Sequence, residues 1–498
     1  MGLNPMNRRE FVKAAVVPSF LPLRSARAAP NRPNIILMMA DDLGWGDPGF
    51  DGNRIIRTPH LDAMAKRGIR FTRFYSGGPV CSPTRGTCLT GRHYFRYGVT
   101  HANEGMLPKP EITIATMLKA LGYTTGHFGK WHLGTLTREI KDGRRGGPGT
   151  KTYMPPWEHG FDVSFSTEQA VPTWDPMRNQ PFATKYWEGP GRYASGNLEG
   201  DDSRVMMDRV APFIQAAAKA GQPFLAVIWF HAPHQPVVAG SAYRAMYSSY
   251  DEGQQHFFGC ITALDEQVGR LRQELVRLAV ADNTMTWFAS DNGPEGLTGD
   301  EGTNRGTTGG LRGRKRSLFS GGVNVPGLFE WPNHTQPGRV IETSCSTLDY
   351  LPTIQEVTGA TLPGKPRPVD GVSLMPLLAG KTTGRPVPLC FRYIDPKKAM
   401  HGSPTVAMLE GRYKLLTNFS EDAREDMLFD VVADRAEADN IIAKHAETAR
   451  SMKKRLRRWI ESCEASHAGA DYDTPFTPLE PFPILTGTWP PERGGAPE

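Results

Sequence analysis

The stretch "NIILMMADD", residues 34–42, places an unbroken apolar run directly before two aspartates. A short continuous apolar run bounded by polar residues is typical of a strand buried on both faces of a parallel sheet. Three further runs have the same character: "PFLAVIWF" (223–230), "TMTWFAS" (284–290) and the weaker "TTGHFG" (124–129). Together they predict the centre of a large, mostly parallel sheet.

Helical patterns lie between these runs. The segment 58–68 starts with Thr58 as a cap and ends on Gly68, and the segment 113–122 also ends on a glycine, Gly122. The segment 258–278 carries a row of apolar residues on one helical face, namely Ile261, Leu264, Val268, Leu271 and Leu275. Strands that alternate with helices predict an α/β fold in which helices sandwich the sheet. The Gly-, Pro- and aromatic-rich segment 141–202 lacks this alternation, and we expect long ordered loops there.

The pattern changes towards the C-terminus. "VAMLEGRYKLLTN" (406–418) predicts a hairpin that turns near Glu410 and Gly411. A helix follows whose apolar face holds Met452, Leu456, Trp459, Ile460 and Cys463. We therefore expect a large α/β domain over residues 30–384 and a smaller α+β domain with an antiparallel sheet over residues 385–498.

The N-terminus differs from the rest of the chain. Arg8 and Arg9 precede a modest apolar segment and then an Ala-Arg-Ala sequence at 26–28. This order resembles a bacterial twin-arginine export signal with a cleavage site near Ala28; the alternative is a basic tail. The signal predicts removal of residues 1–28 and a periplasmic or secreted protein.

Charge and cysteine content narrow the function classes. The chain has 58 basic and 52 acidic residues among 498, a mild excess that does not favour nucleic acid but is compatible with an anionic substrate. It has no apolar run of about 18 residues, so we expect no membrane span. Its six cysteines form no dense disulfide framework, and Cys88, Cys260 and Cys463 have the surroundings of buried apolar residues.

Polar residues follow each predicted strand. Asp41 and Asp42 follow the run at 34–40, and Asp291 and Asn292 follow the run at 284–290. Lys130 and His132 follow the run at 124–129, and His231 and His234 follow the run at 223–230. Open α/β sheets bind ligands at the carboxyl ends of their strands. Three aspartates and an asparagine amount to an oxygen ligand set for a hard divalent cation, particularly calcium. A lone aspartate after a strand also serves as a helix cap, and His231 is equally well explained as a packed histidine.

The stretch "GGPVCSPTRGTCLTGR" (77–92) places Cys81 at the start of a predicted helix. Free N–H groups at a helix start favour anions and lower the pKa of a thiol there, so Cys81 is also a candidate nucleophile in its own right. A disulfide is a further alternative for this segment. Spacing alone indicates an anion site with a cysteine and a metal.

Several blocks of the sequence are similar to those of a known enzyme family. "CSPTRGTCLTGR" (81–92) is similar to the signature of type I sulfatases, C-x-P-x-R followed by L-T-G-R. Other blocks resemble the family in the same order: "GKWHLG" (129–134), "WEHGFD" (157–162), "HAPHQP" (231–236), "ASDNG" (289–293) and "LFDVVADRAEADNI" (428–441). The resemblance implies an alkaline phosphatase-like fold, sulfate ester hydrolysis over the large domain, and a maturation enzyme that oxidises Cys81 to formylglycine (3-oxoalanine).

The same resemblance assigns roles residue by residue. It implies one Ca²⁺ held by Asp41, Asp42, Asp291 and Asn292, with the modified Cys81 also touching the metal. It implies that Arg85 and Lys130 steady the formylglycine diol and that His132 takes a proton from it. It also implies that His234 and Lys315 hold the sulfate and that His234 has an acid role toward the leaving oxygen.

The loop around Lys315 departs from the family pattern. Arg316, Ser320 and Asn324 stand where the usual form has Gly, Glu and Arg. In so polar a loop we expect little apolar cover for Lys315 and a role in catalysis rather than in folding.

The resemblance implies a sulfated carbohydrate or small sulfate ester as substrate. Aromatic residues of the 141–202 segment either stack on sugar rings or pack within the loops: Trp157, Trp174, Tyr186, Trp187 and Tyr193.

Three other functions are alternatives to a sulfatase. They are a phosphonate or phosphodiester hydrolase of the same superfamily, a binding protein with a dead site, and a hydrolase that uses the unmodified thiol. Asn292, which stands where the phosphonate and two-zinc relatives usually have His, favours calcium and sulfate esters.

Overall fold

The protein is described by a computed structural model that covers residues 1–2, 32–296, 306–394, 404–419 and 426–473. The predicted export signal therefore lies outside the described residues, apart from its first two. Within the described part, no helix has the length and apolarity needed to cross a bilayer.

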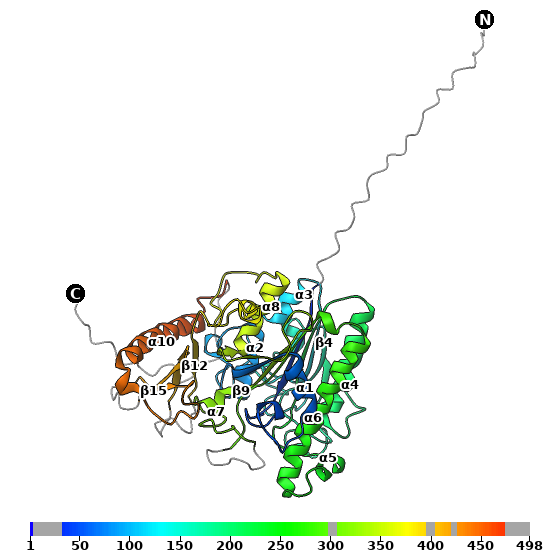
Figure 1. The fold of residues 1–498 in the computed structure, drawn as a ribbon. Coiled ribbons are helices and arrows are strands. Elements are labelled where there is room, and N and C mark those ends of the chain that lie inside the picture. Colours follow the sequence, from blue (N-terminus) through cyan, green and yellow to red (C-terminus); the bar gives the residue numbers. More distant parts are fainter. Residues whose placement is uncertain (3–31, 297–305, 395–403, 420–425, 474–498) are drawn as a thin grey trace.

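A large sheet of eleven strands forms the centre of the molecule (Figure 1). Its order is β10-β2-β9-β8-β1-β7-β3-β4-β5-β6, and β11 pairs with β2. The bounds are β1 (Asn34–Ala40), β2 (Ile69–Tyr75), β3 (Thr124–Lys130), β4 (Val163–Thr167), β5 (Trp187–Gly189), β6 (Arg192–Tyr193), β7 (Phe224–Trp229), β8 (Thr284–Ser290), β9 (Asn324–Glu330), β10 (Arg339–Ile341) and β11 (Cys345–Ser346).

The four apolar runs of the sequence form the parallel centre of this sheet. They are the adjacent strands β8, β1, β7 and β3, and each pairs in parallel with its neighbour. Strand β9 is antiparallel to both β8 and β2, so the sheet is mixed but mostly parallel, as predicted.

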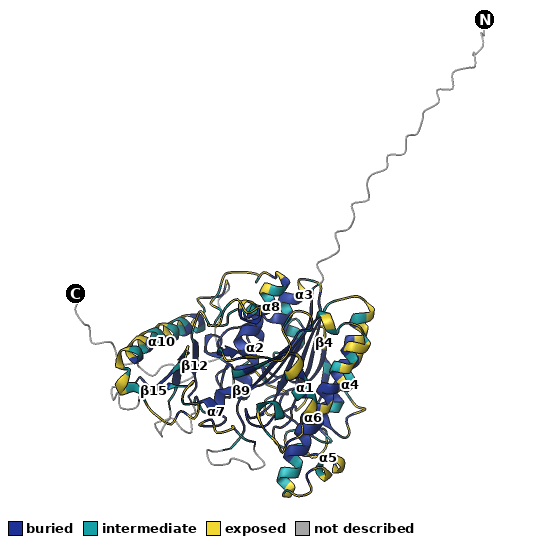
Figure 2. Cartoon of the chain, in the orientation of Figure 1, coloured by how far each residue is buried: buried dark blue, intermediate teal, exposed yellow. Residues whose placement is uncertain are grey.

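Helices cover both faces of the sheet, and burial is greatest between the layers (Figure 2). Along β1, Ile35, Leu37 and Met39 face one apolar cluster, while the alternate residues face the other, which explains the unbroken apolar run. One layer contains α1 (Pro59–Arg67), α4 (Asp202–Lys219), α5 (Ser241–Ala245) and α6 (Glu252–Arg277); the other contains α2 (Cys81–Thr90), α3 (Ile114–Lys119), α8 (Tyr350–Thr358) and α9 (Met375–Leu378). Helix α6 begins earlier than predicted because Asp251 caps it by accepting a hydrogen bond from the Gln254 N–H.

A second, antiparallel sheet contains β12 (Leu389–Arg392), β13 (Val406–Glu410), β14 (Tyr413–Thr417) and β15 (Met427–Asp430). Strands β13 and β14 form the predicted hairpin. One face of this sheet packs on the large unit through Tyr75, Val80 and Leu318, and the other packs on α10 (Ala446–His467). The remaining short helices are η1 (Gly49–Asp51), η2 (Tyr94–Arg96), η3 (Pro156–His159), η4 (Ala281–Asn283), α7 (Ser320–Val323), η5 (Thr347–Asp349) and η8 (Ile442–Lys444).

The segment 141–202 is not purely loop, contrary to expectation. It contributes β4, β5 and β6, which extend the sheet beyond β3. The apolar pattern misses β4 because Ser164 and Ser166 occupy buried positions in it. Their hydroxyls bond to each other, and Ser166 also bonds to the ring of His127, so these polar groups are satisfied inside the core.

Candidate active site

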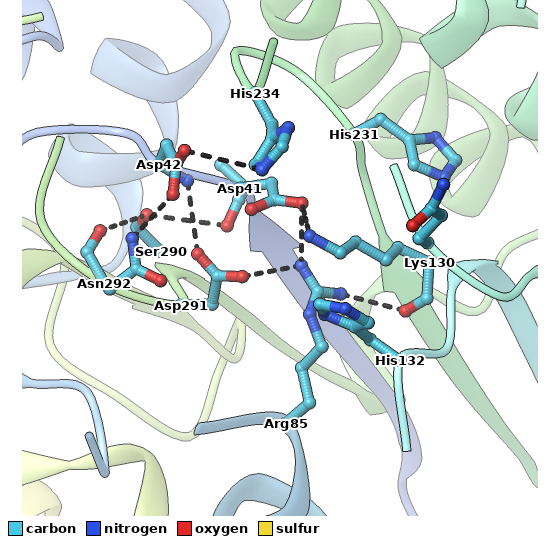
Figure 3. Close-up of polar contacts among 12 residues, drawn as sticks. Asp41, Asp42, Arg85, Lys130, His132, His231, His234, Ser290, Asp291 and Asn292 are labelled. Atoms are coloured by element: carbon cyan, nitrogen blue, oxygen red, sulfur yellow. Dashed lines mark hydrogen bonds and ion pairs between the residues drawn. The ribbon is translucent and has the colours of Figure 1, made fainter. Parts of the chain in front are cut away.

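The carboxyl ends of four adjacent strands bring the predicted site residues to one edge of the sheet (Figure 3). Asp41 and Asp42 follow β1, Asp291 and Asn292 follow β8, and Lys130 ends β3. A cavity of about 1200 Å³ opens at this edge, and its wall includes Cys81, Lys130, His132, His234 and Lys315. Arg85, from α2, lies beneath it, fully buried.

The acidic residues form a tight hydrogen-bonded group. The backbone N–H of Asp42 donates to Oδ1 of Asp291 at 3.1 Å, and the side-chain amide of Asn292 donates to Oδ1 of Asp42 at 2.7 Å. Asp42 has a φ of 68°, in the left-handed region that non-glycine residues rarely adopt. Strain of this kind gathers at functional sites, where the surrounding structure holds it in place.

Three buried cations face the aspartates. Lys130 Nζ lies 2.6 Å from Asp41 Oδ2, Lys315 Nζ lies 2.6 Å from Asp42 Oδ1, and an Arg85 nitrogen lies 2.7 Å from Asp291 Oδ2. Burial alone would raise the pKa of Asp41, but the charges led by Lys130 hold it well below its usual range. Burial and the charge of Asp41 raise the pKa of Asp291 to about 7.

The donor set fits a hard divalent cation. Asp41 Oδ1 and Asn292 Oδ1 are buried oxygens without a hydrogen-bond partner among the described residues. Ligand atoms of Asp41, Asp42, Cys81 and His234 all lie within 4.8 Å of one another. Unpaired buried oxygens are costly unless something binds them, and oxygen-rich sites suit calcium or magnesium. His234 joins this group although the sequence indicated only a role on the sulfate.

Cys81 is the first residue of α2, as predicted, and it is buried at the cavity wall. Its pKa is nevertheless not lowered: burial raises the pKa of the thiol to about 12. Desolvation of a charged thiolate here outweighs the attraction of the neighbouring Lys130 and Lys315. All six cysteines, including Cys81 and Cys88, are free, so the disulfide alternative is wrong.

His132 is oriented by a residue that the sequence did not single out. Its Nε2 lies 2.9 Å from Oδ1 of Asn103, a residue in the connection between η2 and α3. An amide oxygen only accepts, so Nε2 carries the proton and Nδ1, buried and without a hydrogen-bond partner, keeps its lone pair. Burial and the adjacent Lys130 lower the pKa of His132 well below its usual value.

The two histidines after β7 have different surroundings. His231 is fully buried, and its ring bonds to Asp202 at 2.7 Å and to Thr167 at 2.8 Å, so it is a packed histidine. His234 lies at the cavity, with Nε2 3.8 Å from Asp42 Oδ2, and burial lowers its pKa to about 4. Because its Nδ1 donates to the carbonyl oxygen of Gln235 at 2.6 Å, Nε2 is the nitrogen that exchanges a proton with the cavity.

The loop of Lys315 is more ordered than its sequence indicates. Lys315 is buried, at 5% exposure, which corrects the expectation of little cover. Arg316, with a φ of 73°, forms two hydrogen bonds to Glu295 at 2.6 and 2.9 Å, and Glu295 Oε2 lies 3.4 Å from Lys315 Nζ. The backbone N–H of Ser320 donates to Glu437 at 2.6 Å, so a residue that follows β15 supports this loop.

The aromatic residues expected to stack on sugar rings are not on the cavity wall. Tyr186 and Trp187 are buried, and none of the other three candidates lines the described part of the cavity. Phe182 and Tyr393 line it instead. Carboxylates suited to a divalent cation, buried cations and a residue at a helix start surround one cavity, and this arrangement suits the hydrolysis of an anionic ester.

Comparison with known proteins identifies the family. A family model described as Sulfatase matches residues 33–360, and one described as N-sulphoglucosamine sulphohydrolase, C-terminal, matches residues 313–462. N-acetylgalactosamine-6-sulfatase from Homo sapiens is 33% identical over 390 residues, which cover 73% of this chain and 69% of the relative. Arylsulfatase A from Bos taurus is 33% identical over 420 residues, which cover 79% and 76%. The chain belongs to the sulfatase family.

Solved structures agree with this assignment. The crystal structure of Ps i-CgsB in complex with k-i-k-neocarrahexaose has a TM-score of 0.74 and 26% identity, covering 86% of this chain and 93% of that one. The phosphonate monoester hydrolase of Agrobacterium radiobacter has a TM-score of 0.61 at 20% identity, a likeness of fold alone. The protein is therefore a sulfuric ester hydrolase with the predicted alkaline phosphatase-like fold, and neither the phosphonate hydrolase nor the dead-site alternative is supported.

Proposed function

We propose that this sulfatase cleaves sulfate monoesters of a sulfated carbohydrate, using one Ca²⁺ and a formylglycine made from Cys81. The observation that carries the proposal is the convergence at one cavity of Cys81, three buried cations and buried oxygens that lack partners. Asp41, Asp42, Asp291 and Asn292 would hold the ion. When bound, the ion would supply a Lewis acid for a sulfate oxygen, and the modified residue 81 would supply a nucleophilic hydroxyl.

The three buried cations of the site would stabilise the negative charge of the sulfate in this reaction. A sulfate monoester places negative charge on its terminal oxygens, and more develops on the leaving oxygen as the S–O bond breaks. Lys130, Arg85 and Lys315 are held by carboxylates in a buried site, where preorganised charges stabilise a transition state most strongly.

The two cavity histidines handle protons. His132 offers the lone pair of Nδ1 for a proton from residue 81, because Asn103 keeps the other nitrogen protonated. His234 exchanges its proton at Nε2, the nitrogen that faces the acidic group. Its pKa of about 4 leaves Nε2 without a proton at neutral pH, so the negative charge of a bound sulfate would have to raise that pKa before His234 protonates the leaving oxygen.

The carbohydrate preference is supported by the names of the relatives and by the cavity. One relative is named an N-acetylgalactosamine-6-sulfatase, and one solved neighbour is in complex with a neocarrahexaose. The cavity of about 1200 Å³ exceeds the range of about 300–1,000 Å³ usual for drug-sized ligands. A saccharide of more than one ring suits that size better than a small aryl sulfate.

The proposal includes export and maturation. The Arg8-Arg9 signal of the sequence supports passage through the twin-arginine route to the periplasm or beyond, and replacement of both arginines by lysine should retain the protein in the cytoplasm. A formylglycine-generating enzyme would act on the "CSPTR" segment at residues 81–85. The proposed division at residues 384 and 385 is supported by the separate sheets on either side of it.

Turnover of sulfated substrates tests the function. Mature protein should hydrolyse 4-nitrophenyl sulfate and release sulfate from at least one sulfated oligosaccharide, with no comparable rate on a phosphonate ester. Chelation should abolish the rate and Ca²⁺ should restore it. Full activity after chelation, or two equivalents of zinc by elemental analysis, would reject the calcium assignment.

A further inference from the structure

The active-site cavity has four lysine or arginine side chains on its described wall. Three have carboxylate partners: Lys130 pairs with Asp41, Lys315 with Asp42, and Arg316 with Glu295. The fourth is Arg144, and no carboxylate of the described residues lies within ion-pair distance of its guanidinium. Its charge is therefore available to a ligand in the cavity.

Arg144 sits on a tight turn whose ends are fixed. Asp142 and Gly146 pair with each other, with the Gly146 N–H donating to the Asp142 carbonyl oxygen at 2.9 Å. The buried side chain of Asp142 accepts a hydrogen bond from the Lys185 N–H at 2.8 Å, which ties the turn to the segment before β5. Gly143 has a φ of 58°, and a Cβ there would lie 2.1 Å from a carboxylate oxygen of Glu168, so the turn packs closely on Glu168.

Glu168 is the obvious acid for Arg144, but its side chain is already engaged. It is fully buried, and Arg145 donates to its Oε1 at 3.1 Å. Its Oε2 accepts only the backbone N–H of Arg144, at 3.3 Å, among the described contacts. The two arginines of the turn therefore have different surroundings. Arg145 neutralises the buried Glu168, and the side chain of Arg144 stays exposed.

Phe182 fixes the direction of the exposed side chain. The guanidinium of Arg144 lies 4.2 Å from the centroid of the Phe182 ring, and both residues line the cavity. A stacked guanidinium keeps the N–H groups along its edge for hydrogen bonds, and their planar fork matches a carboxylate or a sulfate. An ordinary solvated surface arginine has neither the anchored turn nor the aromatic platform.

We propose that Arg144, stacked on Phe182, forms a subsite for a second anionic group of the substrate, carried by the saccharide beyond the ester that is cleaved. The group is a sulfate or a carboxylate, since both present paired oxygens to the fork. This inference rests on the proposed function, because it takes the ligand to be a sulfated saccharide in the same cavity.

The test compares wild type, Arg144→Gln and a matched control, Arg178→Gln. Arg178 is an exposed arginine of the same connecting region that does not line the cavity. Three probes compete with 4-nitrophenyl sulfate turnover: N-acetylgalactosamine 6-sulfate with one anion, the unsaturated chondroitin 6-sulfate disaccharide with an added carboxylate, and N-acetylgalactosamine 4,6-disulfate with an added sulfate. Inhibition constants do not require that a probe be the natural substrate.

We expect Arg144→Gln to raise the inhibition constant of at least one doubly anionic probe by about tenfold or more, because the variant loses the charged hydrogen bonds to the added group. The singly anionic probe and the KM for 4-nitrophenyl sulfate should stay within about twofold, and Arg178→Gln should change nothing. Whichever added group shows the loss, carboxylate or sulfate, is the one that Arg144 binds.

An equal change for all three probes, or no change for either doubly anionic probe, would overturn the subsite while leaving sulfatase activity intact. If mature wild type releases sulfate from neither 4-nitrophenyl sulfate nor any sulfated oligosaccharide, it is the proposed function that has failed. Calorimetric binding of the same three probes to wild type and Arg144→Gln then decides the subsite by the same pattern of losses.

Discussion

Lys315 shows at the residue scale how a cation is held ready for an anionic substrate. Its Nζ contacts both oxygens of Asp42, at 2.6 and 2.7 Å, and Glu295 lies 3.4 Å away. Lys315→Ala should lower kcat on a sulfate ester by about 10²–10³, the usual effect of losing one preorganised charge contact. Because Asp42 would be left buried without this partner, a lower Tm is also expected, and rates should be compared well below the variant's Tm.

Arg316→Gly is the matched control for this variant. Glycine accepts the φ of 73° without strain, and the change removes the partner of Glu295 but leaves the Lys315–Asp42 pair. Its kcat should stay within about tenfold of wild type. A larger loss for Arg316→Gly than for Lys315→Ala would make Arg316 the cation that acts on the sulfate.

Asn103 gives a second residue-scale prediction. Asn103→Gly removes the acceptor for His132 Nε2, and glycine tolerates the φ of 65° at this position. The ring is then free to take the tautomer in which Nδ1 is protonated, so kcat should fall by about tenfold or more with little change in KM. Asn103→Asp keeps an acceptor oxygen and should retain more activity than the glycine variant; the reverse order would contradict the role given to Asn103.

At the element scale, the carboxylate of Asp370 links α10 to η2, because it accepts hydrogen bonds from both helices. Arg96 forms two bonds to its carboxylate at 2.7 and 2.8 Å, and the indole of Trp459, on α10, donates to it at 2.9 Å. Burial alone would raise the pKa of Asp370, but Arg96 lowers it to about 2. Asp370→Asn leaves a buried arginine without its charge partner and should cost about 3–5 kcal/mol of unfolding free energy.

The pH dependence of this effect has a definite sign. Since the folded pKa lies below the usual carboxyl value, the contribution is complete above about pH 4 and disappears as pH falls towards 2. The Tm difference between wild type and Asp370→Asn should therefore be constant from pH 8 to about pH 5 and narrow in acid. Glu410→Gln, which breaks a half-exposed pair with Arg455 of α10, should cost at most about 1 kcal/mol. A difference that widens in acid would contradict the account.

At the scale of the whole molecule, the small sheet is part of the active enzyme. Its inner face covers Tyr75, Val80 and Leu318, and Glu437 supports the loop of Lys315 through Ser320. A chain that ends at residue 384 should expose this apolar face, aggregate or lose cooperative unfolding, and lack sulfatase activity. A soluble truncated protein with normal kcat would show that the large unit is independent.

The sequence predicted the elements whose burial leaves a simple pattern. Strands β1, β7, β8 and β3 are covered on both faces, so their apolar runs are continuous, and the polar residues after them had to meet at one edge. Strand β4 was missed because its buried serines are satisfied by partners that only the fold supplies.

The unpredicted part of the site depends on contacts between distant loops. Asn103 meets His132 across 29 residues, and Glu295 meets Arg316 across 21. No periodicity records such pairs. The burial of Lys315 was unforeseen for the same reason, since its partners Asp42 and Glu295 belong to other segments of the chain.

The chemical state of residue 81 tests the central claim most directly. Fully active protein, co-expressed with a maturation enzyme, should be digested and the peptide that contains residues 81–85 analysed by mass spectrometry, with Cys81→Ala as the inactive control. The account predicts the aldehyde or its hydrate at position 81, in proportion to specific activity across preparations. An unmodified thiol at position 81 in fully active protein would contradict it and would favour Cys81 itself as the nucleophile.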